Sequence, residues 1–248
     1  MGLFKARGTF VLAQVAKWLK KSDAEKFHAV HVARRALKRF GGCDESDIAI
    51  FSNENAPTGF AAFSRNSSSE SETVLVVCPK NAEPAMARAE FLANWPVTST
   101  KVFFFSLDTL ESSEDVSWTG ADFAKIMLEI RSCLAGEARS RLGVVGVSAG
   151  GPPAIIPGFL LGADYVLAAG PTSPLKFPEV LHALQRGPAS TFAEIIYARD
   201  CSKDEKAARE WAELVPGISL KPVATSEHTV FRYLATRRLL SETLADCI

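Results

Sequence analysis

The sequence lacks several features that would each indicate a particular class of function. It has no excess of one charge, since 28 lysines and arginines balance 28 aspartates and glutamates, so no global field would recruit nucleic acid. It also has no apolar run of about 20 residues, the length that a membrane-spanning helix requires. We therefore expect neither nucleic-acid binding nor integral membrane association.

Cysteine and histidine are scarce, which limits disulfide and metal chemistry. Five cysteines are scattered without C-x-x-C spacing, a pattern typical of reduced thiols rather than of a disulfide scaffold or a zinc site. His28 and His31 lie three residues apart on an expected helix, but a metal site needs at least three protein donors and no third ligand accompanies them. No glycine-rich phosphate loop is present. The sequence predicts no bound metal and no cofactor.

Residues 1–42 form a predicted helical N-terminal extension. Its apolar residues 10–16 follow Lys5 and Arg7, as in a signal peptide, but the run is short and no cleavage site follows it. We interpret the segment as helices docked on the rest of the fold, with weak peripheral contact to a membrane surface as the alternative. The expected location is cytoplasmic.

Residues 43–248 alternate between short apolar strands and helical segments. Strands are predicted at residues 47–51, 59–63, 74–78, 101–105, 142–147, 164–169, 193–197 and 218–223, and helices at about 83–94 and 120–139. A hairpin-like connection joins the first two strands. Near-continuous apolar strands alternating with helices are typical of an α/β fold with a mostly parallel sheet and helices on both faces. Active sites in such sheets lie beyond the carboxyl ends of the strands.

The strand at 142–147 leads into the sequence Gly146-Val147-Ser148-Ala149-Gly150, which fits the G-x-S-x-G pattern of a nucleophile elbow. A serine on a tight strand-to-helix turn adopts a strained backbone, so the positions two before and two after it must be small. Such a turn exposes the hydroxyl above the sheet and points helix N–H groups toward it. The alternative is an ordinary glycine-rich turn with a solvated serine.

A serine hydroxyl needs a base to accept its proton. His228 lies in the turn that follows the predicted strand 218–223, which is where a base from another strand end would lie. The sequence therefore predicts that Ser148 and His228 meet at the carboxyl edge of the sheet.

A carboxylate should then orient the imidazole. Asp200 follows the strand 193–197 by a short loop and is our first choice. Asp204 is the runner-up. Residues 202–205 resemble a capping box that would place Asp204 in the first turn of a helix, where the helix dipole favours a carboxylate whether or not it is catalytic. Glu227 is a third candidate.

The elbow motif, the strand order and the chain order Ser148, Asp200, His228 resemble the α/β-hydrolase superfamily over about residues 47–248. The resemblance implies an esterase, thioesterase, lipase, peptidase or acyltransferase scaffold. By position, Ser148 would be the nucleophile, His228 the general base and then acid, and Asp200 the orienting carboxylate.

The resemblance also implies an oxyanion hole. The backbone N–H of Ala149 would supply one half, and Lys80 or Asn81, after the strand 74–78, the other. The sequence departs from one family pattern, since no His-Gly stretch follows that strand. The prolines within residues 152–157 imply a helix after the serine that is short or kinked.

A cap-like insertion is predicted at about residues 170–190, where Phe177 and Leu181 would wall a substrate pocket. It is too short for a deep lipid tunnel. We therefore expect a serine esterase acting on a small-molecule ester, with a small or medium acyl group that could sit on a carbohydrate. The alternatives are an acyltransferase using the same residues, and a hydrolase-fold binding or scaffold protein without catalysis.

Overall fold

The computed structural model describes residues 48–51, 60–65, 72–78, 91, 94–96, 100–106, 127–128, 130–131, 134, 141–174, 184 and 191–248. The predicted extension at residues 1–42 lies outside this part of the chain. So do most of the helices expected at about 83–94 and 120–139, and most of the insertion at about 170–190.

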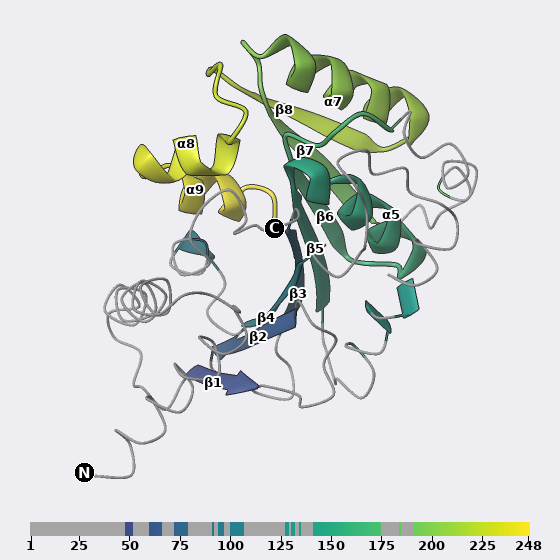
Figure 1. Cartoon of the computed structure of the whole chain (residues 1–248), viewed down its shortest axis with the longest axis vertical. Helices are drawn as coiled ribbons and strands as arrows, with labels where there is room; N and C mark the ends of the chain where they lie inside the picture. Colours follow the sequence, from purple (N-terminus) through teal and green to yellow (C-terminus); the bar gives the residue numbers. More distant parts are fainter. Residues whose placement is uncertain are drawn as a thin grey trace, which may run out of the picture.

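Within these ranges eight strands form one sheet, in the order β1-β2-β4-β3-β5-β6-β7-β8 (Figure 1). The strands are β1 (Ile48–Phe51), β2 (Phe60–Arg65), β3 (Glu72–Cys78), β4 (Thr100–Ser106), β5 (Arg141–Val147), β6 (Tyr165–Ala169), β7 (Phe192–Ala198) and β8 (Ile218–Val223). Strand β2 pairs antiparallel with β1 and β4, whereas every pairing among β3 to β8 is parallel. The predicted mostly parallel sheet is confirmed, and so is the antiparallel pairing of the first two strands.

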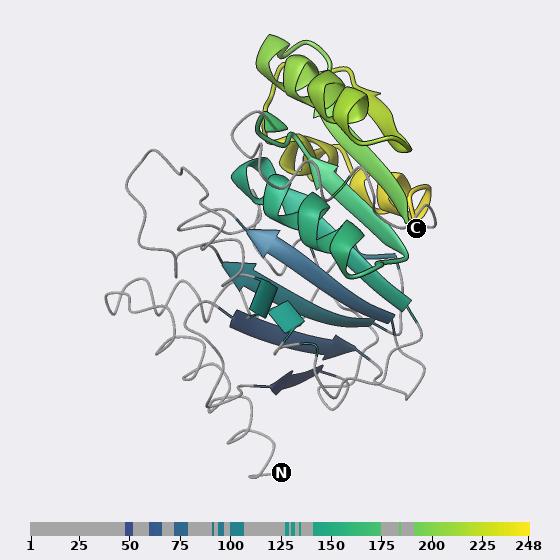
Figure 2. The same cartoon turned by 90° about the vertical axis from the view of Figure 1, so that its right-hand side faces the viewer.

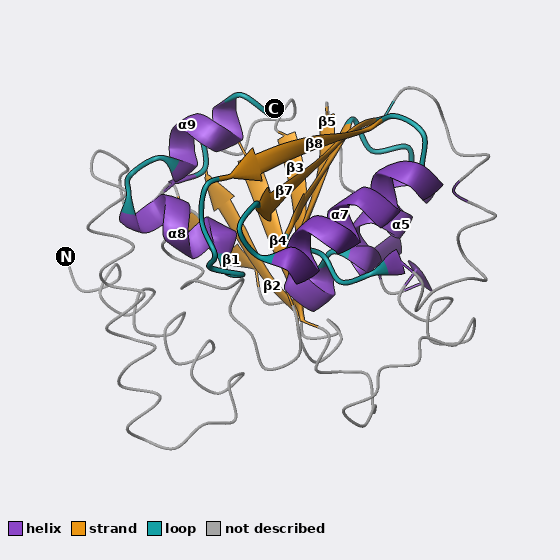
Figure 3. Ribbon diagram, turned by 90° about the horizontal axis from the view of Figure 1, so that it is seen from above, coloured by secondary structure: helices purple, strands orange, loops and turns teal. Residues whose placement is uncertain are grey.

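Helices cover both faces of the sheet, as predicted. The described helical elements after β5 are η3 (Ser148–Gly150), α5 (Pro152–Leu160), α7 (Ser202–Leu214), α8 (Val230–Thr236) and α9 (Leu240–Ala245). Seen from above, α5 and α7 lie on one side of the sheet and α8 and α9 on the other (Figure 3). Among the described helices, none is long and apolar enough to cross a membrane.

Two apolar cores hold these layers together. Alternate residues of β3 face opposite sides, with Leu75 in the core under α5 and α7, and Val76 in the core under α8 and α9. This explains why the strand is an unbroken apolar run, since both of its faces are buried. Figure 2 shows α5 and α7 packed across the strands on one face.

Helix α5 accommodates its prolines. Pro152 and Pro153 occupy its first turn, where a missing N–H costs no intrahelical hydrogen bond. Pro157 lies inside the helix, which ends at Leu160 after nine residues. The expectation of a short helix after the serine is confirmed. Because β5 to β8 are parallel, their carboxyl ends, and the turns that follow them, lie along one edge of the sheet.

Candidate functional site

Ser148 lies on a strained turn at the end of β5. Its φ angle is +52°, in the left-handed region that costs an L-residue about 1–2 kcal/mol. The chain closes at once into η3, and the N–H of Gly151 donates to the carbonyl of Ser148 at 2.9 Å. The side chain is half-buried. The turn thus presents the hydroxyl at the carboxyl edge of the sheet, as an elbow requires.

Small residues make this turn possible. A side-chain carbon on Gly146 would lie 2.3 Å from the carbonyl oxygen of Gly150 and 2.5 Å from Cβ of Ala154. One on Gly151 would lie 2.5 Å from Cβ of Pro171, on the segment after β6. Strand, turn and helix approach so closely that a methyl group has no room at either position.

The structure brings Ser148 and His228 together. The hydroxyl Oγ lies 2.8 Å from Nε2 of the imidazole, and the other ring nitrogen, Nδ1, lies 2.7 Å from Oδ1 of Asp204. A carboxylate can only accept, so Nδ1 carries the proton and Nε2 is left as an acceptor for the serine proton. Asp204 is 3% exposed, whereas the imidazole is 45% exposed. The carboxylate that contacts the imidazole is therefore buried, while the imidazole itself is partly open to solvent.

Asp200, the first choice for the orienting carboxylate, does not contact His228; the carboxylate that does is that of Asp204, the runner-up. The side chain of Asp200 is 54% exposed and pairs with Arg199 at 3.3 Å. The reason lies in where α7 begins. Asp204 is in the first turn of that helix, at the positive end of the helix dipole, and this turn carries its carboxylate to the imidazole. The feature that argued against Asp204 in the sequence is the one that places it.

The predicted capping box is also absent from the start of α7. Cys201, not Ser202, is the N-cap residue, and it makes no side-chain cap hydrogen bond. Glu205 instead pairs with Arg209 at 2.7 Å on the exposed face of the helix. Glu227, the third candidate for the acid, is exposed, and its backbone N–H donates to Oγ1 of Thr225 at 3.1 Å.

Gly170 is a residue of this site that sequence reasoning missed. It follows β6 with a φ of +51°, and a side-chain carbon on it would lie 3.2 Å from Oδ2 of Asp204 and 3.4 Å from Cε1 of His228. The sequence offers one signal for it, a glycine directly after a buried strand, at the start of the predicted insertion.

The remaining predicted site residues stand as follows. Ala149 is the second residue of η3, and amides at the start of a helix have no intrahelical acceptor. Lys80, Asn81, Phe177 and Leu181 lie outside the described residues.

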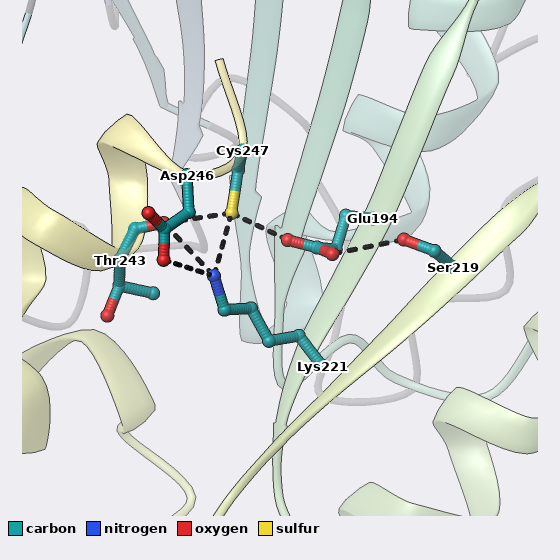
Figure 4. Close-up of polar contacts among 6 residues, drawn as sticks. All are labelled: Glu194, Ser219, Lys221, Thr243, Asp246 and Cys247. Carbon is teal, nitrogen blue, oxygen red and sulfur yellow. Dashed lines mark hydrogen bonds and ion pairs between the residues drawn. The ribbon is translucent and has the colours of Figure 1, made fainter.

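A second cluster of titratable side chains lies between the sheet and α9 (Figure 4). The thiol of Cys247 donates to Glu194 of β7 at 2.6 Å, and the ammonium of Lys221 of β8 lies 3.3 Å from Asp246. Burial, together with the neighbouring carboxylate of Glu194, raises the pKa of the Cys247 thiol from 9.0 to about 12. The thiol stays protonated at neutral pH, so this cluster holds no nucleophile. Among the described residues no group of three or more histidines, cysteines and acids could hold a metal ion.

No protein-family model matches the sequence, and no curated protein matches it either. Solved structures do resemble it. A dienelactone hydrolase from Anabaena variabilis has a TM-score of 0.61 at 10% identity, covering 80% of this chain and 96% of its own. A predicted CIB-like hydrolase from Thermoplasma acidophilum has a TM-score of 0.53 at 16% identity, covering 80% and 99%. An alpha-beta serine hydrolase homologue from Coxiella burnetii has a TM-score of 0.55 at 11% identity, covering 79% and 96%.

Proposed function

Because the chain has the α/β-hydrolase fold, we propose that it is a serine hydrolase that cleaves an ester through an acyl-enzyme intermediate. One observation carries the proposal: the unbroken chain of short contacts from Oγ of Ser148 through the imidazole of His228 to the buried carboxylate of Asp204. A glycine-rich turn with a merely solvated serine would need neither the base nor the acid.

In the first step, Nε2 of His228 accepts the hydroxyl proton while Oγ of Ser148 bonds to the ester carbonyl carbon. The carbonyl electron pair moves onto oxygen, and the N–H of Ala149 stabilises the resulting oxyanion. When the carbonyl re-forms, the bond to the alcohol breaks and Nε2 returns the proton to the leaving oxygen. Asp204 holds the proton on Nδ1 throughout and stabilises the imidazolium.

In the second step, Nε2 of His228 takes a proton from water as the water oxygen bonds to the acyl carbon. Collapse of this second intermediate breaks the bond to Oγ, which regains a proton from the imidazolium, and the carboxylic acid leaves. General base catalysis of this kind contributes about 10²–10⁴-fold, and one oxyanion donor about 10²–10³-fold.

The proposed substrate is a small-molecule ester with a small or medium acyl group, which is the size that the short predicted insertion at about residues 170–190 could enclose. Phe177 and Leu181 are the proposed apolar walls. The dienelactone hydrolase among the similar structures acts, by its name, on a lactone, and a lactone is a cyclic ester.

A fluorophosphonate probe tests the proposal directly, because it reacts readily with an activated serine and not with an ordinary serine hydroxyl. Intact-mass analysis should find one adduct on the native protein and none on Ser148→Ala or His228→Ala. Hydrolysis of aryl acetate, butyrate and octanoate esters would then rank acyl lengths. Product formed on an added alcohol rather than on water would identify an acyltransferase. A folded native protein without any adduct would overturn the hydrolase proposal in favour of a binding protein.

A further inference from the structure

Gly170 lies where the parts of the proposed catalytic site converge. It is the first residue after β6, the strand that pairs with β5 on one side and β7 on the other. The chain leads from β5 to Ser148 and from β7 to the helix that carries Asp204. The N–H of Gly170 donates to the carbonyl of Ile196 in β7 at 2.9 Å. Its backbone is therefore fixed to the sheet between the nucleophile and the acid.

The bare Cα of Gly170 faces the pair formed by Asp204 and His228. A side-chain carbon there would lie 3.2 Å from Oδ2 of Asp204, 3.1 Å from the carbonyl oxygen of His228 and 3.4 Å from its Cε1. The two distances to oxygen atoms are tighter than ordinary van der Waals contact, whereas the distance to Cε1 is at its lower limit. A methyl group would therefore require the carboxylate or the backbone of His228 to shift by a few tenths of an ångström.

The carboxylate of Asp204 is held from one side only. Oδ1 bonds to the imidazole at 2.7 Å, but Oδ2 is buried and has no hydrogen-bond partner in the described part of the chain. A carboxylate bonded through a single oxygen can rotate unless packing prevents it. A side-chain carbon on Gly170 would lie 3.2 Å from this unpaired Oδ2, so a side chain at that position would crowd the carboxylate.

The residues after Gly170 contact both the turn that carries Ser148 and the helix α7 that carries Asp204. Pro171 packs against Gly151 of the nucleophile turn. The indole N–H of Trp211, on α7, donates to the carbonyl of Thr172 at 2.8 Å. Glu210, the residue before Trp211 on the same helix, accepts a hydrogen bond from the hydroxyl of Ser173. The segment therefore joins the turn of the serine to the helix of the acid.

We propose that Gly170 is a positioning residue for Asp204 and His228. We also propose that residues 170–173 form a connecting segment that fixes helix α7, which carries Asp204, relative to Ser148. The inference rests on the proposed function of Ser148. Because Gly170 has no side chain, it leaves room for Oδ2 of the buried carboxylate while Oδ1 bonds to Nδ1. A displacement of about 1 Å at such a site can cost about 100-fold in rate.

Gly170→Ala tests the inference, with Gly162→Ala and Gly217→Ala as matched controls. The control glycines have φ angles of +62° and +90°, but a side-chain carbon on either would meet nothing within 4 Å. All three variants place alanine in a backbone conformation that it disfavours, and only one of them also crowds Asp204.

We expect Gly170→Ala to lower kcat on an aryl ester about 100-fold with little change in KM, while both controls keep the native values. The far-downfield proton resonance of Nδ1 on His228 should shift or vanish in Gly170→Ala alone. In an Asp204→Asn background, Gly170→Ala should cause no further loss, since its effect passes through that carboxylate. A native kcat in Gly170→Ala would overturn the inference. So would a loss of kcat in the double variant that equals the product of the losses in Gly170→Ala and Asp204→Asn.

A second variant keeps the inference testable if Gly170→Ala does not fold. Trp211→Phe removes the donor to Thr172, so kcat should fall severalfold, whereas Arg209→Ala, on the exposed face of the same helix, should not change it. Unchanged kcat in Trp211→Phe would count against the role of residues 170–173 in fixing α7 relative to Ser148. A native protein that forms no fluorophosphonate adduct would instead overturn the proposed hydrolase function. The Nδ1 resonance would still show whether Gly170 positions Asp204 against His228.

Discussion

The carboxylate of Asp204 lies 2.7 Å from Nδ1 of His228, although the two residues belong to different elements, the first turn of α7 and the turn between β8 and α8. This contact decides which of two aspartates after β7 can serve the proposed chemistry. Asp200, four positions earlier, points its carboxylate at Arg199 and solvent.

Exchanging each aspartate for asparagine separates them. Asp204→Asn should lower kcat on an aryl ester about 10⁴-fold, because the amide cannot hold the proton on Nδ1 and stabilise the imidazolium. Asp200→Asn has the same change of side chain and should leave kcat at the native value. A large loss from Asp200→Asn with little loss from Asp204→Asn would show that the acid had been assigned to the wrong residue.

Gly146→Ala should disrupt the turn that carries Ser148. Its methyl carbon would lie 2.3 Å from the backbone oxygen of Gly150, which cannot swing away as a flexible side chain would. Overpacking of this kind costs about 1–3 kcal/mol of the free energy of unfolding, and fluorophosphonate labelling should slow. Urea unfolding measures the first effect and the labelling rate the second. Native values of both the free energy of unfolding and the labelling rate would contradict the close approach of β5 and α5 at Gly146.

Tyr165→Phe should destabilise the opposite edge of the sheet. The tyrosine hydroxyl donates to Oε1 of Glu72 at 2.9 Å, and that carboxylate, only 5% exposed, also accepts from Thr100 and Trp95. Removing one donor from a buried carboxylate should lower the free energy of unfolding by about 1–3 kcal/mol. Urea unfolding measures it.

Tyr233→Phe is the control for this change, because its hydroxyl contact, 3.3 Å to the carbonyl of Ala224, is exposed. It should shift the free energy of unfolding by less than about 0.5 kcal/mol. Equal effects from the two variants would argue against a special role for Glu72. Burial, with the charge of Glu72 next, also raises the pKa of Tyr165 well above 10, so alkaline absorbance titration should find the ionisation of Tyr165 shifted to higher pH.

Cys247 should make the protein less stable at high pH. Burial, and then the contact with Glu194, raises the pKa of the thiol from 9.0 to about 12 in the folded chain. The folded state binds this proton more tightly, so the stabilisation is complete below about pH 9 and is lost as the pH rises toward 12. The free energy of unfolding should therefore fall more steeply between these values in the native protein than in Cys247→Ala.

Alkylation gives an independent check on that thiol. Iodoacetamide at pH 8, followed by peptide mass mapping, should modify the partly exposed Cys201 well before the buried Cys247. The order follows from the exposure of Cys201 and from the burial and raised pKa of Cys247. Rapid alkylation of Cys247 in the folded protein would contradict both its burial and its raised pKa.

Much of the fold could be predicted because its causes are local. The strand β3 is an apolar run that can only be buried on both faces, and the small residues around Ser148 permit a tight turn whatever surrounds them. His228 could be chosen because it follows the last predicted strand and parallel strands end at one edge.

What the sequence determined by itself was therefore the set of strands, the turn that exposes Ser148 and the histidine that contacts it, since backbone sterics and burial act over a few neighbouring residues. Only the tertiary structure decided between Asp200 and Asp204, because one turn at the start of α7 sets which carboxylate reaches the imidazole. It alone placed Gly170 against that carboxylate. Both outcomes depend on how α7, the end of β6 and the turn after β8 pack together, and no local pattern encodes distances between segments so far apart in the chain.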